Sequence, residues 1–108
     1  MDDERERIRY EKVKKKTVDF IYESIYMIMH EDLKPNNPNS CTKQFIEEGY
    51  TVTVNMIYSI KNDSRVLSKN INIDKKISSR TWQVSDNYYF PTLKNGKVLH
   101  VFMEAYIE

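Results

Sequence analysis

The sequence predicts a single α+β domain in which a long N-terminal helix packs on a curved antiparallel sheet of four to five strands. Apolar residues recur with helical spacing in the first third of the chain, and apolar and polar residues alternate through much of the rest. The pair Asn95-Gly96 marks a tight turn between two of the predicted strands. With 108 residues the chain can bury one core but not two, so residues 1–108 are expected to form one unit.

The helix is predicted in two sections. Residues 1–16 form a charged helical extension, in which acids precede bases at helical spacing, as in Asp3 with Arg7 and Glu11 with Lys15. From Thr17 onward the spacing of apolar residues makes one broad face, and Pro35 ends the segment. The residues of that face are Val18, Ile21, Tyr22, Ile25, Ile28, Met29 and Leu33.

Residues 40–48 are predicted to form a short second helix, with Gly49 as its left-handed stop. Alternation then predicts a strand over 50–60, which turns at Asn62-Asp63 and returns over 65–73. This register satisfies both faces of the hairpin. It places Tyr58 opposite Leu67, Val54 opposite Ile71 and Val52 opposite Ile73.

A second hairpin is predicted around Asn95-Gly96 as a two-residue loop, with Tyr89 opposite Phe102 and Leu93 opposite Val98. Its last strand carries one wholly apolar face: Leu99, Val101, Met103, Ala105 and Ile107. A helix lying across such a sheet is similar to a roll of the cystatin or NTF2 type. The likeness is one of fold alone, because no residue motif carries it, and no functional residue follows from it.

Composition limits the classes of function. The net charge of +1 disfavours a dedicated nucleic-acid-binding protein, which usually has a large positive excess. Cys41 is the single cysteine, so no internal disulfide forms, and no segment has the ~18 consecutive apolar residues of a membrane span. We therefore expect a soluble protein of the cytoplasm, or of the host cytoplasm if the source is viral. The abundance of Lys, Ile, Asn and Tyr, which have AT-rich codons, predicts an AT-rich genome.

No catalytic motif is found, so the chain is not expected to be an enzyme. Gly49 and Gly96 are the only glycines, too few for a phosphate-binding loop. His30 and His100 are the only histidines, and neither stands in a recognisable zinc or nucleophile pattern. No metal and no cofactor are predicted.

The second hairpin has a further apolar face, which predicts an interaction surface. We expect a protein-interaction module that forms a homo-oligomer, binds another protein, or does both. Its small size and AT-rich bias are typical of a phage or mobile-element accessory protein that inhibits a host factor. The residues expected at the interface are Tyr89, Phe102, His100 and Tyr106, with Phe20 and Met27 from the helix.

Three alternatives remain open. The apolar face is covered by the N-terminal segment or the short helix and is purely structural. A small ligand or nucleotide binds between helix and sheet, with Arg80, Trp82 and Tyr88 as contacts. A nucleic acid binds to Lys14, Lys15 and Lys16, although an exposed charge run of this kind usually only stabilises a helix.

Overall fold

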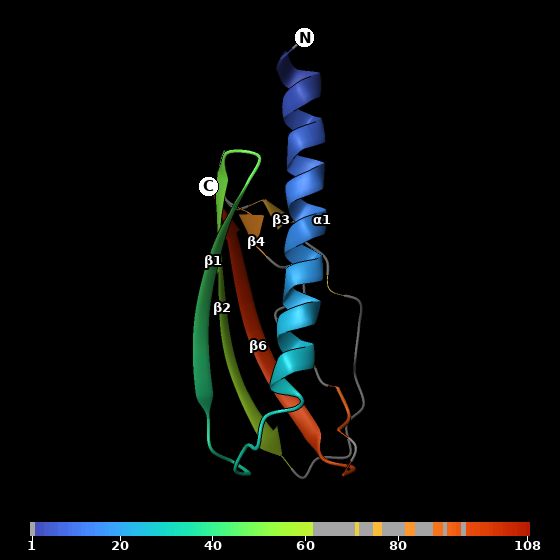
Figure 1. Ribbon diagram of the computed structural model, residues 1–108, viewed down its shortest axis with the longest axis vertical. Coiled ribbons are helices and arrows are strands. Elements are labelled where there is room, and N and C mark those ends of the chain that lie inside the picture. Colours follow the sequence, from blue (N-terminus) through green and yellow to red (C-terminus); the bar gives the residue numbers. More distant parts are fainter. Residues whose placement is uncertain are drawn as a thin grey trace.

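A computed structural model shows one long helix packed on an antiparallel sheet, so the predicted α+β class is confirmed (Figure 1). The residues that it describes are 2–61, 71, 75–76, 82–83, 88–89, 91–93 and 95–108. The backbone alone is described for residues 2–3, 75–76, 82–83 and 88–89. In chain order the elements are α1 (Asp2–Ile28), β1 (Asn39–Glu47), β2 (Tyr50–Lys61), β3 (Lys75–Lys76), β4 (Trp82–Gln83), β5 (Tyr88–Tyr89) and β6 (Val98–Ile107).

The charged extension and the apolar segment form one continuous helix, α1. Its buried face carries side chains three or four positions apart, which is the spacing of one helical stripe. Thr17 lies within this stripe, and its hydroxyl donates to the carbonyl oxygen of Val13 at 2.7 Å, so that its burial leaves no donor unsatisfied. The buried residues of α1 are Val13, Thr17, Ile21, Ser24, Ile25 and Ile28.

The helix ends at Ile28, earlier than the apolar spacing through Leu33 predicts. A turn follows, in which the N–H of His30 donates to the carbonyl oxygen of Met27 at 3.1 Å. The Nδ1 atom of His30 also lies 2.8 Å from the carbonyl oxygen of Tyr26. A side chain that bonds a carbonyl of the last turn in this way stabilises a helix end.

The short helix predicted over residues 40–48 is wrong, because this segment is strand β1. Glu48 and Gly49 both have positive φ, at 52° and 80°, which is the conformation of a two-residue type I′ hairpin loop. Gly49 therefore does adopt the predicted left-handed backbone, but it joins two strands. The register Glu47 opposite Tyr50 runs back to Asn39 opposite Tyr58.

The hairpin predicted between residues 50–60 and 65–73 is also wrong. Strand β2 lies between β1 and β6, so both of its edges are already hydrogen-bonded. Val54, for example, stands opposite Lys43 and Ala105. Residues 65–73 lie outside the described part of the chain except for Ile71, which is buried and donates its N–H to the Tyr22 hydroxyl of α1 at 2.8 Å.

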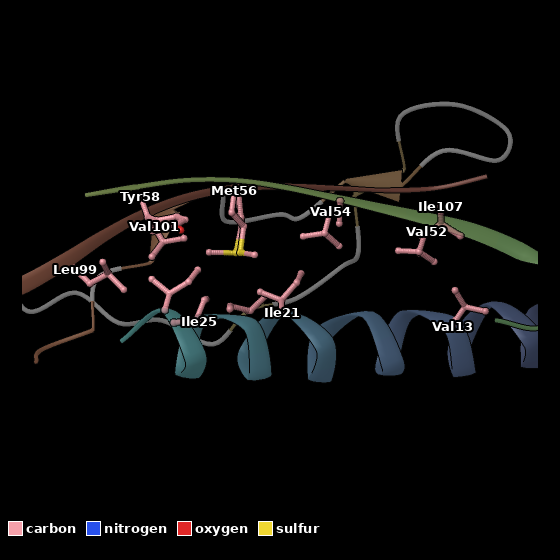
Figure 2. Close-up of a cluster of buried hydrophobic side chains, with 14 of the residues drawn as sticks. Val13, Ile21, Ile25, Val52, Val54, Met56, Tyr58, Leu99, Val101 and Ile107 are labelled. Carbon is pink, nitrogen blue, oxygen red and sulfur yellow. The ribbon is translucent and has the colours of Figure 1, made fainter. Parts of the chain in front are cut away.

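The main sheet has the order β1-β2-β6-β5, in which three strands are long and β5 contributes two residues. Its curved inner face lies along α1, and Figure 2 shows side chains of helix and strands meeting in one apolar layer. The predicted apolar face of the last strand is confirmed, since Leu99, Val101, Met103, Ala105 and Ile107 are all fully buried. From β2 the core receives Val52, Val54, Met56, Tyr58 and Ile60.

The register of the last hairpin differs by one residue from the prediction. Tyr88 stands opposite Phe102, and Tyr89 stands opposite Val101. The N–H of Leu93 donates to the carbonyl oxygen of Lys97 at 2.8 Å and closes the loop, in which Gly96 has φ at 79°. A loop that is one residue longer than the predicted Asn95-Gly96 pair moves every residue of the incoming strand to the other face.

A cluster of side chains fastens the start of α1 to the β1–β2 turn. The ring of Tyr50 lies 4.6 Å from that of Tyr10, and its hydroxyl donates to Oε1 of Glu6 at 2.6 Å. Arg9 lies over the Tyr50 ring, 5.2 Å from its centre, and donates to the carbonyl oxygen of Glu48. The charged extension is thus held against the sheet from Glu6 onward.

We predict that Ile21→Ala lowers the free energy of unfolding by about 2–5 kcal/mol, because Ile21 is fully buried in the middle of the helix–sheet layer. Urea titration followed by circular dichroism measures this change. Met27→Ala is the matched control on the same helix, where the side chain is 62% exposed and the expected change is within about 0.5 kcal/mol. Equal effects at the two positions would contradict the packing described.

Tyr50 predicts a loss of stability at alkaline pH. Burial and the hydrogen bond to Glu6 raise the pKa of Tyr50 to about 12, above its ordinary value of 10.0. The native state therefore keeps this proton where the unfolded chain loses it. The corresponding stability is fully present below pH 10 and is lost as the pH rises towards 12, by about 2 kcal/mol.

Urea titrations at a series of pH values from 8 to 12 test this prediction. The Tyr50→Phe variant has no such proton, so its unfolding free energy is expected to fall less steeply than that of the unchanged protein. Tyr26→Phe, at an exposed position of α1, is the control and should follow the unchanged protein. Parallel pH profiles for all three proteins would exclude the role assigned to Tyr50.

Candidate interaction surface

The sheet has a second face, turned away from α1, which is formed by alternate residues of β2 and β6. Because successive side chains of a strand point to opposite sides, burial of the inner set against the helix leaves the other set on this outer face. The strand register aligns these residues in rows across the sheet. The rows are Ser59 with His100, Ile57 with Phe102, Asn55 with Glu104 and Thr53 with Tyr106.

One row of the outer face is apolar. Ile57 is 52% exposed and stands directly opposite Phe102, which is half-buried. Directly opposed side chains on one face have Cβ atoms about 4.5–5.5 Å apart, so the two side chains lie side by side. On its other edge, Ile57 faces Ser40 of β1, which is exposed. The row forms a small apolar stripe between polar neighbours.

The two polar rows on one side of this stripe, Asn55 with Glu104 and Thr53 with Tyr106, are held by hydrogen bonds within the sheet. The Thr42 hydroxyl donates to Oδ1 of Asn55 at 2.9 Å, and the Gln44 amide donates to the Thr53 hydroxyl at 2.9 Å. The Tyr106 hydroxyl donates to a carboxylate oxygen of Glu104 at 3.1 Å.

Burial, followed by this hydrogen bond, raises the pKa of Tyr106 above its ordinary value of 10.0. The surface therefore offers ordered polar rows beside the apolar stripe, an arrangement typical of a contact surface.

The structure brings together three of the six predicted interaction residues. His100, Phe102 and Tyr106 lie on the outer face of β6, as predicted. The register does not place Tyr89 in a row with these residues. Tyr89 stands opposite the inner-face residue Val101, and Tyr88 takes the position opposite Phe102. The predicted cross-strand pair of Tyr89 and Phe102 is therefore wrong.

Phe20 and Met27 also do not join this surface, because they lie on α1, which covers the opposite face of the sheet (Figure 1). The Phe20 ring packs against that of Phe45 at 4.9 Å, at the seam between α1 and β1. Met27 projects from α1 farther along the helix and is 62% exposed. Phe20 and Met27 thus lie on two different surfaces, both separate from the outer face of the sheet.

Sequence reasoning missed Ile57, Phe45 and Ile46. Ile57 stands at an outer-face position of the alternating segment 50–60, where a β-branched apolar residue among Thr and Asn was the available indication. Whether Ile57 belongs to an apolar row depends on the residue that stands opposite it in the neighbouring strand. That neighbour is Phe102 of β6, some 45 residues away, and the expected hairpin with 65–73 concealed it.

The side chains predicted to contact a small ligand are those of Arg80, Trp82 and Tyr88. Arg80 lies outside the described residues, and only the backbones of Trp82, in β4, and Tyr88, in β5, are described. A hollow of about 620 Å³ lies beside the last turns of α1. The described residues that line it are Tyr22, Glu23, Ile25, Tyr26, Met27 and Met29.

The lysines predicted for nucleic-acid binding lie beside carboxylates. Lys14 Nζ is 2.8 Å from Glu11, and Lys16 Nζ is 2.9 Å from Glu47 of β1. Lys15 lines a hollow at the α1–β1 seam with Lys12 and Lys16, together with acidic side chains. A phosphate at this site would compete with the carboxylates, so the arrangement favours helix and seam stabilisation.

Among the residues described, no three His, Cys, Asp or Glu side chains come together as a metal site requires. The same part of the chain holds no helix with the length and apolarity needed to cross a membrane. No protein-family model, no curated protein and no solved structure matches the sequence or the fold.

Proposed function

We propose that this protein is a non-enzymatic protein-interaction module that self-associates through the outer face of its sheet. The observation that supports this most directly is the apolar row formed by Ile57 and Phe102 on a face that the helix does not cover. Burying a large apolar side chain against a second protein surface contributes roughly 1.5–3 kcal/mol to the free energy of association. Covering this row would therefore stabilise an assembly.

The partner that fits best is another copy of the chain. In a two-fold pair, each copy presents the same stripe, so Ile57 and Phe102 meet Ile57 and Phe102 of the second copy, and the ordered polar rows form the rim. The hydrogen bonds of Asn55, Thr53 and Tyr106 are made within the chain, so they survive when water is removed.

The wider setting is also part of the proposal. The composition supports a cytoplasmic accessory protein of a phage or mobile element, for which binding and inhibiting a host factor is a fitting task. The long helix lying across one face of the sheet supports a roll of the cystatin or NTF2 type (Figure 1).

We predict that wild-type protein is a discrete oligomer and that Phe102→Ser or Ile57→Ser halves its mass, because either change interrupts the apolar row. Light scattering after size exclusion measures the mass. Met27→Ser, on the opposite layer and similarly exposed, is the matched control and should leave the mass unchanged. Variants that keep the wild-type mass would show that the outer face is not the self-association surface.

A second candidate function is binding of a small apolar ligand, favoured by the hollow of about 620 Å³ on α1. Its described lining is mostly apolar and aromatic, and its size is within the range of ligand pockets, roughly 300–1,000 Å³. Tyr26 and Met27 form part of that lining and are both exposed, so they can be changed without disturbing the core.

For this second function we predict saturable binding of the apolar dye anilinonaphthalene sulfonate, weakened about tenfold by Met27→Ser combined with Tyr26→Ser. Fluorescence titration measures the affinity. Ile46→Ser, on the outer face of β1 and 73% exposed, is the control. Dye binding that does not change between these variants, or does not saturate, would count against a ligand site in this hollow.

A further inference from the structure

The free edge of β1, a nine-residue strand, carries backbone groups that none of the described strands pairs with. β1 is the terminal strand of the sheet order, and Figure 1 shows it at the margin of the molecule, with no described strand on the side away from β2. In a hairpin with a two-residue loop, the pair next to the loop, here Glu47 and Tyr50, is hydrogen-bonded. The odd-numbered residues of β1 therefore bond to β2, and the even-numbered residues direct their N–H and C=O groups to the free edge.

Features that normally protect a strand edge are sparse here. Ile46 is 73% exposed and β-branched, and the strand contains neither proline nor glycine. The one protective feature is Lys43, an exposed charge at a position whose neighbours in the same strand, Cys41 and Phe45, are half-buried. Lys43 repels an added strand that places another positive charge directly opposite it.

The seam between this edge and α1 has an ordered distribution of charge. At its centre the rings of Phe20 and Phe45 lie 4.9 Å apart. A hollow of about 400 Å³ runs along the seam, with basic residues before Phe20 on the helix and acidic residues from the same turn onward. The lining residues are Lys12, Lys15, Lys16, Asp19, Phe20, Glu23 and Glu47.

We propose that the α1–β1 seam is a two-fold interface, in which β1 pairs antiparallel with β1 of a second copy and the axis passes through Phe45. This inference rests on the proposed self-association and adds an interface separate from the outer face. In this register Lys43 stands opposite Glu47 of the second copy, and Gln44 stands opposite Ile46 of the second copy. Gln44 and Ile46 are even-numbered, so their free backbone groups meet in hydrogen-bonded pairs.

The same axis brings opposite charges of the two helices α1 towards each other. Phe20 lies beside Phe45, so the axis passes near Phe20 and sets α1 antiparallel to α1 of the second copy. Lys16, one turn before Phe20, then faces Glu23 of the second copy, about one turn after it. α1 lies nearest to β2, so the two helices are about 14 Å apart, three strand spacings, which leaves the four phenylalanine rings to fill the gap.

Charge favours this register over the one centred on Lys43. An axis through Lys43 would set Lys43 against Lys43 of the second copy, a like-charge pair that destabilises a sheet. An axis through Phe45 replaces that repulsion with two Lys43–Glu47 pairs. Glu47 already lies 2.9 Å from Lys16 within its own chain, so each contact becomes part of a network of three charges.

The first test uses Ile46→Pro in the Phe102→Ser background, where the outer face is already disabled. The Ile46 N–H faces the free edge, so proline there spares the β1–β2 ladder and removes a donor from the proposed pairing. Ser40→Pro is the matched control, since its N–H faces the same edge but lies outside the paired register. Light scattering should show a dimer for the background and the control, and a monomer for Ile46→Pro, with circular dichroism unchanged.

The outcomes separate this inference from the proposed function. A Phe102→Ser protein that is monomeric at high concentration overturns the seam interface and leaves the outer-face proposal standing. A wild-type dimer that Phe102→Ser leaves intact and Ile46→Pro dissociates overturns the outer-face proposal and supports the seam. A monomeric wild type overturns both.

The second test examines the register by mixing charge variants in the same background. Lys43→Glu and Glu47→Lys each set like charges against each other in their own dimers, so each dimer should dissociate about tenfold more readily. An equimolar mixture restores both opposite-charge pairs in the mixed dimer, and the dimer population should return. Absence of rescue in the mixture would overturn the register centred on Phe45.

Discussion

The pairing of β2 with β6 is the constraint on which the rest of the structure depends. Once β6 and β1 occupy the two edges of β2, alternation assigns each of its residues to one face. Val52, Val54 and Met56 meet the helix, and Ile57 is left on the outside beside Phe102. The apolar core, the outer stripe and the free edge of β1 are all consequences of this one arrangement.

The helix is fixed to this sheet near its start as well as along its stripe, and a further contact outside the sheet holds it towards its end. Near its start, Glu6, Arg9 and Tyr10 converge on Tyr50, at the turn that joins β1 to β2. Towards its end, the Tyr22 hydroxyl accepts the N–H of Ile71. These contacts hold α1 in one position along the sheet, so Phe20 stands beside Phe45 and Lys16 beside Glu47. The charge pattern of the seam therefore has a definite geometry.

The two surfaces described have different physical character. The outer face offers an apolar row with a hydrogen-bonded polar surround, and its strength would come from burial. The seam offers open backbone groups and alternating charge around an aromatic centre, and its specificity would come from register. One surface is a face of the sheet and the other is the sheet's β1 edge together with α1, which gives a module of this size two ways to assemble.

The sequence by itself determined the α+β class, the continuous N-terminal helix, and the inner face of β6, because each depends on periodicity within a single segment. It also placed His100, Phe102 and Tyr106 on one face. It did not determine that residues 40–48 form a strand, or that β6 rather than 65–73 borders β2. Those choices were made by tertiary structure, because a strand selects its neighbour by the complementarity of whole faces, and one added loop residue before Val98 was enough to move Tyr89 away from Phe102.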